Sequence, residues 1–597
     1  MSTKQIDVNL FNYSRRKSVA VKVGNLMLGG DNPVRVQSMT NTSTMDTEGS
    51  VAQIMRIVER GGELVRLTTQ GSREAMNLAA IKAAATAAGC GVPLVADVHF
   101  NASVADVAAQ YADKVRVNPG NYVDTARTFK HIEYTDEEYA QELERLGERF
   151  SAFIALCKKE GKAIRVGVNH GSLSDRIMSR YGDTPEGVVE SCMEFLRICK
   201  RENFDNVVVS IKTSNTPVMV TTVRLLNSVM ASEGIFYPLH LGVTEAGDAE
   251  DGRIKSAVGI GALLADGIGD TVRVSLAEAP ENEIPVAKEL VDYISSRVGH
   301  NPVQGEVAAS FDYINPKRRA TRGVLGVGDG RVPVVVCAPV ECANPDLAPD
   351  FVAQDGVLSA ASSLYRLVEP DALDGVAADE KFFLQLNCGD VSAALLERIK
   401  SLPGCVVVAY SNHANPVGEI RALVHRFIND GITAPVIVRR AYAEASVESL
   451  RIKAAADLGV LLIDGLADGV WIENPALPAS DINAIAFGIL QATRSRISKT
   501  EYIACPGCGR TMYDLQGTLA KIKAATGHLK GLKIGVMGCI VNGPGEMADA
   551  DYGYVGAARG KVSLYRKKEC VEKNIPEDEA IARLLELIEN DKNELQG

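Results

Sequence analysis

The sequence has no long apolar run and no excess of basic residues. No stretch of the 597 residues approaches the roughly 20 consecutive apolar residues of a membrane-spanning helix. Its polar start, MSTKQIDVNLFNYSRRKSV, has no apolar run after the basic residues, so we expect no signal peptide and a cytoplasmic protein. The net charge of −11 argues against general nucleic-acid binding, which needs a basic face.

The sequence also lacks two cysteine patterns, although it has 12 cysteines. A second C-x₂-C motif, usual in zinc ribbons, is absent, and so is the C-x₃-C-x₂-C motif of S-adenosylmethionine radical enzymes. A disulfide set is not expected in the cytoplasm. Most cysteines stand singly in apolar surroundings and are interpreted as small buried hydrophobic residues: Cys90, Cys157, Cys192, Cys199 and Cys405.

The first half contains eight short runs rich in valine, isoleucine and leucine, separated by amphipathic segments. The runs lie at 33–39, 62–68, 92–98, 114–119, 163–169, 206–212, 237–243 and 271–276. Eight buried strands that alternate with helices predict a (β/α)₈ barrel, the TIM-barrel fold. A doubly wound open sheet is the competing fold. The strand count and the lack of a glycine-rich dinucleotide turn favour the barrel.

An internal repeat links this barrel to the middle of the chain. Residues 253–275 (RIKSAVGIGALLADGIGDTVRVS) and residues 451–473 (RIKAAADLGVLLIDGLADGVWIE) are identical at 11 of 23 positions without gaps. The region from about 300 to 495 is therefore interpreted as a partial duplicate of the barrel. It is shorter than the ~250 residues of a complete barrel, so we expect some units to be lost.

The second copy lacks the polar residues of the first. Arg273 and Ser275 correspond to Trp471 and Glu473, so we expect a spacer domain rather than a second ligand site. The predicted fold class is α/β, in three domains: a TIM barrel at 1–298, an inserted barrel-like spacer at 299–495 and a small α+β domain carrying the cysteine motifs at 496–597.

Barrel enzymes keep their active sites at the carboxyl ends of the strands. Polar residues stand at the predicted strand ends: Asn41, Asp97, His99, Asn118, Asn169, His170, Lys212, Thr244, Glu245 and Ser275. Five arginines lie inside the strands: Arg35, Arg66, Arg116, Arg165 and Arg273. A single buried arginine usually pairs with a carboxylate. Five of them, with Asp97 and Glu245 as the clear acidic neighbours, indicate an anionic ligand with several oxygens, such as a diphosphate.

The C-terminal region holds three cysteines in two motifs. Cys505 and Cys508 lie in CPGCGRT, and Cys539 lies in VMGCIVNGPGE. A C-x₂-C motif alone fits a zinc ribbon, a redox pair or an iron–sulfur site. Three thiolates and a weaker fourth ligand suit a [4Fe–4S] cluster with one iron open for chemistry. Cys570 and Glu546 are the candidates for the fourth ligand.

Together, these motifs resemble a known family. CPGCGRT and VMGCIVNGPGE, behind a barrel with VQSMTNT, LVADVHF, VRVNPGN, GVNHGSL, SIKTSN and LGVTEAG, resemble the 4-hydroxy-3-methylbut-2-enyl diphosphate synthases of the methylerythritol phosphate route to isoprenoids. The motifs span about 400 residues at both ends of the chain. The central duplicate resembles the long, three-domain form of the family.

The resemblance implies a reaction, a cofactor and site residues. The reaction is the two-electron reductive opening and dehydroxylation of 2-C-methyl-D-erythritol 2,4-cyclodiphosphate, with ferredoxin or flavodoxin as electron donor. The implied cofactor is a [4Fe–4S] cluster held by Cys505, Cys508, Cys539 and Glu546. The implied substrate-binding residues are Arg66, Arg116, Arg165, Lys212, Arg273, Ser275 and Asn542. The implied catalytic residues are Asp97, Asn169, Glu245 and Glu546, with Glu245 handling a proton.

Two other functions remain open at this point. One is a different iron–sulfur reductase of a diphosphate substrate, and the other is a zinc-stapled scaffold that binds an anion without chemistry. The expected partners are the small cyclic diphosphate, the electron donor and a second copy of the chain, with no nucleic acid and no membrane.

Overall fold

The structure, a computed structural model, describes residues 8–99, 101–123, 133–342, 344–540, 543–547 and 549–596. The chain forms two compact units. The terminal unit comprises Arg16–Gly252, Gly269–Lys288 and Lys499–Gly597, and therefore joins most of the N-terminal barrel to the C-terminal residues. The central unit comprises Met1–Arg15, Arg253–Ile268 and Glu289–Ser498.

The terminal unit contains the predicted eight-stranded barrel. Its strands are β3 (Arg35–Met39), β4 (Leu64–Thr69), β5 (Leu94–Val98), β6 (Lys114–Val117), β7 (Ala163–Asn169), β8 (Val207–Lys212), β9 (His240–Leu241) and β10 (Thr271–Val272). Neighbouring strands are parallel, and a bridge between Val209 and Leu239 joins the last edge, β8 to β9. Each of the eight apolar runs contains one strand, so the TIM-barrel prediction is confirmed.

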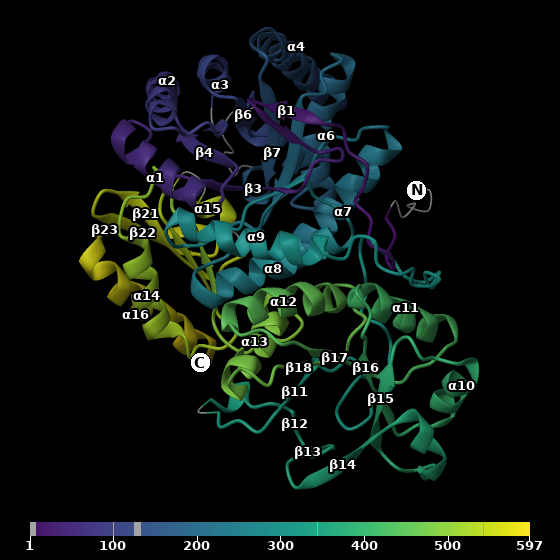
Figure 1. Cartoon of the computed structure of the whole chain (residues 1–597). Coiled ribbons are helices and arrows are strands. Elements are labelled where there is room, and N and C mark those ends of the chain that lie inside the picture. The colour runs from purple at the N-terminus through teal and green to yellow at the C-terminus, as the bar shows by residue number, and fades with distance from the viewer. Residues whose placement is uncertain are drawn as a thin grey trace. The chain divides into compact units, whose positions relative to one another are not determined.

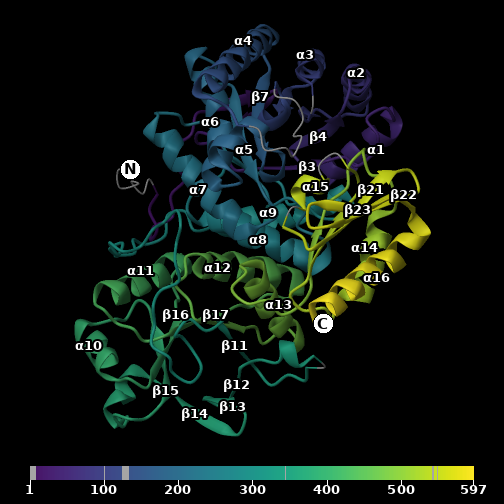
Figure 2. The same ribbon diagram turned by 180° about the vertical axis from the view of Figure 1, so that it is seen from behind.

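Helices cover the outside of this barrel. They are α1 (Thr47–Glu59), α2 (Ser72–Ala87), α3 (Ala102–Tyr111), α4 (Asp136–Glu160), α5 (Asp175–Tyr181), α6 (Pro185–Arg201) and α7 (Thr216–Ser232). The residues of α8 (Ala249–Ala265) and α9 (Glu283–Ser295) are divided between the two units. Helices α2, α3 and α4 lie outside strands β4 and β6 in Figure 1, and α6 and α7 are seen from behind in Figure 2.

A hairpin covers the amino end of this barrel. Strands β1 (Val21–Val23) and β2 (Leu26–Leu28) pair antiparallel. Their buried side chains pack against Leu64, Val95 and Val208 in one apolar cluster. Because this end is filled, a ligand can approach the barrel interior from the carboxyl ends of the strands.

The central unit contains a second closed barrel. Its strands are β11 (Val334–Cys337), β12 (Phe351–Gln354), β13 (Val357–Ala360), β14 (Ser363–Val368), β15 (Phe382–Asn387), β16 (Cys405–Tyr410), β17 (Val436–Ala441) and β18 (Gly469–Glu473). Its helices are α10 (Ala393–Ser401), α11 (Pro416–Asn429), α12 (Val447–Ile463) and α13 (Ala479–Ala492). Eight strands close this barrel, and the loss expected from its length falls on the helices, since β12, β13 and β14 follow one another as antiparallel strands with no helix between them.

The internal repeat occupies equivalent places in the two barrels. Each copy contains an aspartate just before the last strand of its barrel, Asp270 or Asp468. Asp270 Oδ2 accepts a hydrogen bond from the backbone N–H of Leu239 at 2.8 Å, and Asp468 Oδ2 accepts one from Val436 at 2.9 Å. Each aspartate thus connects the turn before the last strand of its barrel to the preceding strand. This shared contact explains why both copies of the repeat have an aspartate at this position.

One buried carboxylate of the central unit accepts hydrogen bonds from four side chains. Asp457, fully buried on α12, accepts hydrogen bonds from Tyr293 (2.7 Å), Arg297 (2.5 Å), Arg440 (3.1 Å) and Tyr442 (3.0 Å). Burial alone would raise the pKa of Asp457, but Arg440 and Arg297 outweigh it and lower that pKa. The carboxylate is therefore ionised, and it joins helix α9 to the second barrel.

Replacing Asp457 with leucine should destabilise the central unit by about 3–5 kcal/mol, because two guanidinium groups lose their buried partner. Trp471, the single tryptophan, lies in the core of the second barrel, so its fluorescence during urea unfolding reports on this unit. Asp457→Asn keeps one acceptor oxygen and should lose less stability. An unchanged urea midpoint in Asp457→Leu would contradict the assignment.

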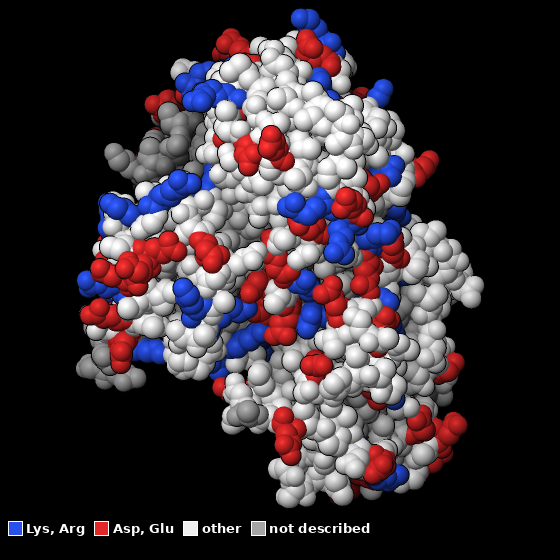
Figure 3. Space-filling view, turned by 60° about the vertical axis from the view of Figure 1, so that its left-hand side comes forward, with Lys and Arg blue, Asp and Glu red and all other residues white. Residues whose placement is uncertain are grey.

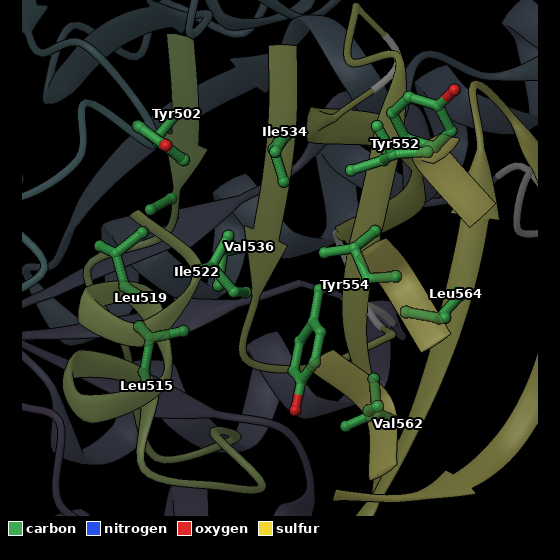
Figure 4. Close-up of a cluster of buried hydrophobic side chains, with 14 of the residues drawn as sticks. Tyr502, Leu515, Leu519, Ile522, Ile534, Val536, Tyr552, Tyr554, Val562 and Leu564 are labelled. Carbon is green, nitrogen blue, oxygen red and sulfur yellow. The ribbon is translucent and has the colours of Figure 1, made fainter. Parts of the chain in front are cut away.

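The C-terminal part of the terminal unit is a five-stranded sheet with helices. Its strands are β19 (Glu501–Ala504), β20 (Lys533–Met537), β21 (Tyr552–Ala558), β22 (Lys561–Arg566) and β23 (Glu569–Pro576), and its helices are α14 (Leu515–Thr526), α15 (Gly543–Glu546) and α16 (Glu577–Gln596). Side chains of α14 and of the strands form one apolar core, including Leu519, Val536 and Tyr554 (Figure 4). Both cysteine motifs follow the carboxyl ends of strands, β19 and β20.

The surface and the helices show two further properties. Acidic and basic side chains are interspersed on the face shown in Figure 3. Among the helices of the described ranges, none combines the length and the apolar character that crossing a membrane requires.

Candidate active site

The carboxyl ends of the first barrel's strands open into a cavity of about 740 Å³. It is lined by the barrel and by the cysteine loops of the same unit. Its lining includes these residues predicted from the sequence: Arg66, Asp97, Arg116, Arg165, Asn169, Lys212, Glu245, Arg273, Ser275, Cys505, Cys508 and Cys539. The structure thus brings together residues that are more than 400 positions apart in the chain.

Asp97 is the carboxylate at the centre of the basic side chains. Its Oδ1 lies 3.1 Å from Arg116 Nη1 and 3.7 Å from Arg165 Nη2, and its Oδ2 lies 3.7 Å from Arg66 Nε. Burial alone would raise the pKa of Asp97, but the three arginines hold it well below its usual value. Asp97 is therefore ionised and offsets part of their charge.

Two other basic side chains line the same cavity. Arg273 forms a bidentate pair with Glu283, with N–O distances of 2.9 and 2.8 Å. Lys212 is buried, and burial together with Arg66 and Arg165 lowers its pKa well below the usual value. Five basic side chains therefore face the carboxyl groups of Asp97 and Glu283, and among the described residues Nε and Nη1 of Arg165 find no hydrogen-bond partner. This arrangement leaves positive charge and free donors for an anion.

Arg35 differs from the other four strand arginines. Its Nη1 lies 2.6 Å from Glu63 Oε1, and Arg35 does not line the cavity. All five arginines have a carboxylate partner, but Arg35 lies at the start of its strand, away from the carboxyl end, whereas Arg66, Arg116, Arg165 and Arg273 also line the cavity.

A polar layer lies deeper in the barrel. Lys114 precedes Arg116 by two residues on β6, so both side chains point to the same face of the strand. Lys114 is fully buried, and its Nζ has no hydrogen-bond partner among the residues that the structure describes. Burial, followed by Arg165 and Arg66, lowers the pKa of Lys114 to about 7. Its neighbour His240 accepts a hydrogen bond at Nδ1 from Gln37 Nε2 at 3.0 Å.

The buried Lys114 should make stability depend on pH. Its pKa falls from the ordinary 10.5 to about 7 on folding, so between these values the unfolded chain binds more protons and stability rises with pH. Lys114→Met removes this penalty. Its melting temperature should exceed that of the wild type most at pH 7, and the gap should narrow by pH 10. A difference in melting temperature between the variant and the wild type that does not change with pH would contradict the lowered pKa of Lys114.

Glu245 and Glu546 form a carboxyl pair at the rim of the cavity. Glu546 accepts hydrogen bonds from Asn169 Nδ2 at 2.6 Å and from Thr244 Oγ1 at 3.3 Å. Burial, and then the proximity of Glu546, raise the pKa of Glu245 well above its usual value. Glu245 also has a positive φ of 48°, a backbone conformation that costs energy for a residue other than glycine. This carboxyl is therefore held neutral in a fixed position.

Two glycines allow Glu546 to reach the barrel. Helix α15, which ends at Glu546, approaches the turn at His170–Ser172. A Cβ on Gly545 would lie 2.1 Å from the carbonyl oxygen of Gly171, which no side chain tolerates. The glycines of GPGE and NHGS are thus needed for backbone contact between the two motifs.

The three motif cysteines line the cavity together. The backbone N–H of Gly538 donates to Cys505 Sγ at 3.2 Å, and burial raises the pKa of the Cys505 thiol to about 12. Cys570 lies outside the cavity lining and its thiol contacts the carbonyl oxygen of Glu572 at 3.6 Å. Three cysteines with an adjacent carboxylate form a donor set suited to iron.

A single metal ion fits these side chains less well than a cluster does. Within the described ranges, no group of three His, Cys, Asp or Glu side chains is gathered closely enough to hold one ion. In a four-iron cluster each thiolate binds a different iron atom, so the sulfur atoms need not converge on one point. The donor set is therefore compatible with a cluster.

The remaining predicted residues have different locations. Ser275 lines the cavity, whereas Asn542 lies outside the described residues. His99 lines the cavity, and its Nδ1 contacts Arg116. His170 lies in a neighbouring cavity of about 760 Å³ that Glu546 also lines, and its Nε2 is 3.1 Å from Asp183.

One cavity residue was missed by sequence reasoning. Arg510, the arginine of CPGCGRT, is buried and lines the cavity beside Cys508 and Cys539. Its position two residues after a motif cysteine could have singled it out.

Comparisons with known proteins agree with this site. Residues 18–288 match the family model of the GcpE TIM-barrel domain, and residues 501–590 match that of the GcpE protein C-terminal domain. A protein of Bacteroides thetaiotaomicron named 4-hydroxy-3-methylbut-2-en-1-yl diphosphate synthase (flavodoxin) is 58% identical, covering 99% of this chain and 100% of the relative. A Phocaeicola vulgatus protein of the same name is also 58% identical, covering 97% and 98%. The resemblance drawn from the motifs is confirmed, and the chain belongs to the GcpE family.

Proposed function

We propose that the protein catalyses the reductive ring opening and dehydroxylation of 2-C-methyl-D-erythritol 2,4-cyclodiphosphate to 4-hydroxy-3-methylbut-2-enyl diphosphate, a step of isoprenoid biosynthesis. The observation that carries the proposal is the single cavity in which a ring of basic side chains faces three cysteines. The names and full-length similarity of the relatives support the same reaction.

The basic side chains bind the diphosphate. Arg66, Arg116, Arg165, Lys212 and Arg273 surround it, and Ser275 adds a hydroxyl donor. The unpaired N–H groups of Arg165 are ready donors to phosphate oxygens. As the ring opens, negative charge grows on the departing diphosphate oxygen, and these fixed cations stabilise it. Asn542 is proposed to assist in positioning the substrate.

Cys505, Cys508, Cys539 and Glu546 hold the [4Fe–4S] cluster in this proposal. When bound, the cluster supplies electrons one at a time to the substrate. A carboxylate would hold iron more weakly than a thiolate, so Glu546 would be the most exchangeable of the four ligands. Asn169 and Thr244 hold its carboxylate through hydrogen bonds. Asn169 lines the cavity and donates a hydrogen bond to Glu546 at 2.6 Å, a contact that favours Glu546 over Cys570 as the fourth ligand.

The other catalytic residues handle protons and orientation. The overall reaction consumes two electrons and two protons and releases one water molecule. Glu245 is neutral in its buried position and is therefore able to donate a proton to the departing hydroxyl. Asp97 fixes the orientation of three arginines, and Asn169 connects the substrate side of the cavity to Glu546.

The electron donor is proposed to be flavodoxin, with ferredoxin as the alternative. The names of the relatives specify flavodoxin. A homodimer is the proposed assembly. The central barrel is proposed to act as a spacer domain, in the three-domain arrangement 1–298, 299–495 and 496–597.

Anaerobic purification followed by turnover tests the function. The protein should be brown, bleach in air and convert the cyclodiphosphate when reduced flavodoxin is supplied. Colourless protein with stoichiometric zinc would contradict the cluster. If the protein is brown but reduces a different diphosphate and not this one, the cluster assignment would stand and the proposed substrate would be wrong.

A further inference from the structure

Arg510 is a buried cation carried by the cysteine loop. It lies two residues after Cys508 and lines the cavity, with 7% of its surface exposed. The cysteine loop packs closely against the barrel. A Cβ atom on Gly509 would lie only 2.7 Å from the carbonyl oxygen of Thr42. The position of Arg510 is therefore fixed by the contact between the cysteine loop and the barrel.

Two donors of Arg510 are unsatisfied. Its Nε and Nη1 are buried and have no hydrogen-bond partner within the part of the chain that the structure describes. A buried guanidinium N–H without a partner is costly, so such groups in native proteins usually meet a ligand. The thiols of Cys508 and Cys539 are neighbours of this guanidinium in the same cavity. The missing partner of Arg510 is therefore on the cysteine side of the cavity.

We propose that Arg510 is a positioning residue for the cluster, whose fixed positive charge and free N–H donors raise the reduction potential of the [4Fe–4S] group. This inference rests on the proposed function. An arginine side chain stays charged at any working pH. Positive charge and hydrogen bonds beside a cluster favour its reduced form, which carries one more negative charge. The barrel cations, in contrast, are arranged around Asp97 and Glu283.

The potential of the holoenzyme tests this role directly. The variants are Arg510→Met, the neutral polar Arg510→Gln, the charged Arg510→Lys, and Lys212→Met as a matched replacement of a basic side chain in the same cavity. Midpoint potentials are measured by anaerobic titration followed by electron paramagnetic resonance. Inorganic diphosphate is the probe for anion binding to the same preparations.

We expect two separate patterns. Arg510→Met and Arg510→Gln should shift the midpoint to more negative potential, and Arg510→Lys should restore most of the shift. Lys212→Met should weaken diphosphate binding by at least tenfold and move the potential less. An unchanged potential in both neutral Arg510 variants overturns the proposal, and so does weakened diphosphate binding in them without a potential shift.

Loss of the cluster from a variant is also informative. If both neutral variants lose the cluster and Arg510→Lys keeps it, the charge is needed to hold the cluster, which supports the proposal. If Arg510→Lys loses it as well, the role is steric and the proposal is wrong. Absence of a cluster from the wild-type protein would instead reject the proposed function, so the two failures are distinguishable.

Discussion

Replacing Cys539 with serine should remove the brown colour of the anaerobic protein and lower its turnover by more than about 100-fold. Replacement of residues that merely support a metal ligand already costs about 10–100-fold. Cys539 lies in the cavity itself, beside Cys505 and Cys508, so its loss should cost more. The visible absorbance, the iron content and the rate with reduced flavodoxin measure the three consequences.

Cys570→Ser is the matched control for this variant. Cys570 is in the same part of the chain and is half-buried, but it does not line the cavity. Its colour, iron content and rate should equal those of the wild type. A colourless Cys570→Ser protein would mean that Cys570 rather than Glu546 completes the ligand set. Retained cluster in Cys539→Ser would reject the ligand assignment altogether.

The first barrel could be predicted because its strands are buried on both faces. Strands of this kind read as continuous apolar runs, and the run 163–169 has the same bounds as strand β7, whereas the runs 237–243 and 271–276 contain strands of two residues each. The central barrel could be predicted only in part. Strand β14 is mostly exposed, so it has no continuous apolar run, and the antiparallel strands β12 to β14 need no helices between them.

The candidate catalytic and binding residues were easier to predict from the sequence than the side chains with which they pair. Strand-end position pointed to Asp97, Lys212 and Glu245, because barrel topology brings all such ends together. It did not distinguish Arg35, whose partner Glu63 comes from the segment before the next strand. Arg510 was missed since its burial depends on a contact between two distant loops. Pairing and burial of this kind arise from tertiary structure.

Replacing Glu245 with glutamine should lower kcat by about 10²–10⁴-fold, the usual contribution of a general acid. Glutamine has nearly the same size and can donate a hydrogen bond, but it cannot release a proton. KM should change little, because the diphosphate is bound by the basic side chains on the barrel. Anaerobic steady-state kinetics separates the two parameters.

The pH profile and a binding control complete this prediction. Burial and Glu546 raise the pKa of Glu245, so the active form is the protonated one, and wild-type kcat should fall as pH rises through that pKa. Glu245→Gln should lose this alkaline fall while keeping the affinity for inorganic diphosphate. Glu245→Asp keeps a carboxyl and should recover part of kcat. A glutamine variant with wild-type kcat would show that the proton reaches the substrate from another group.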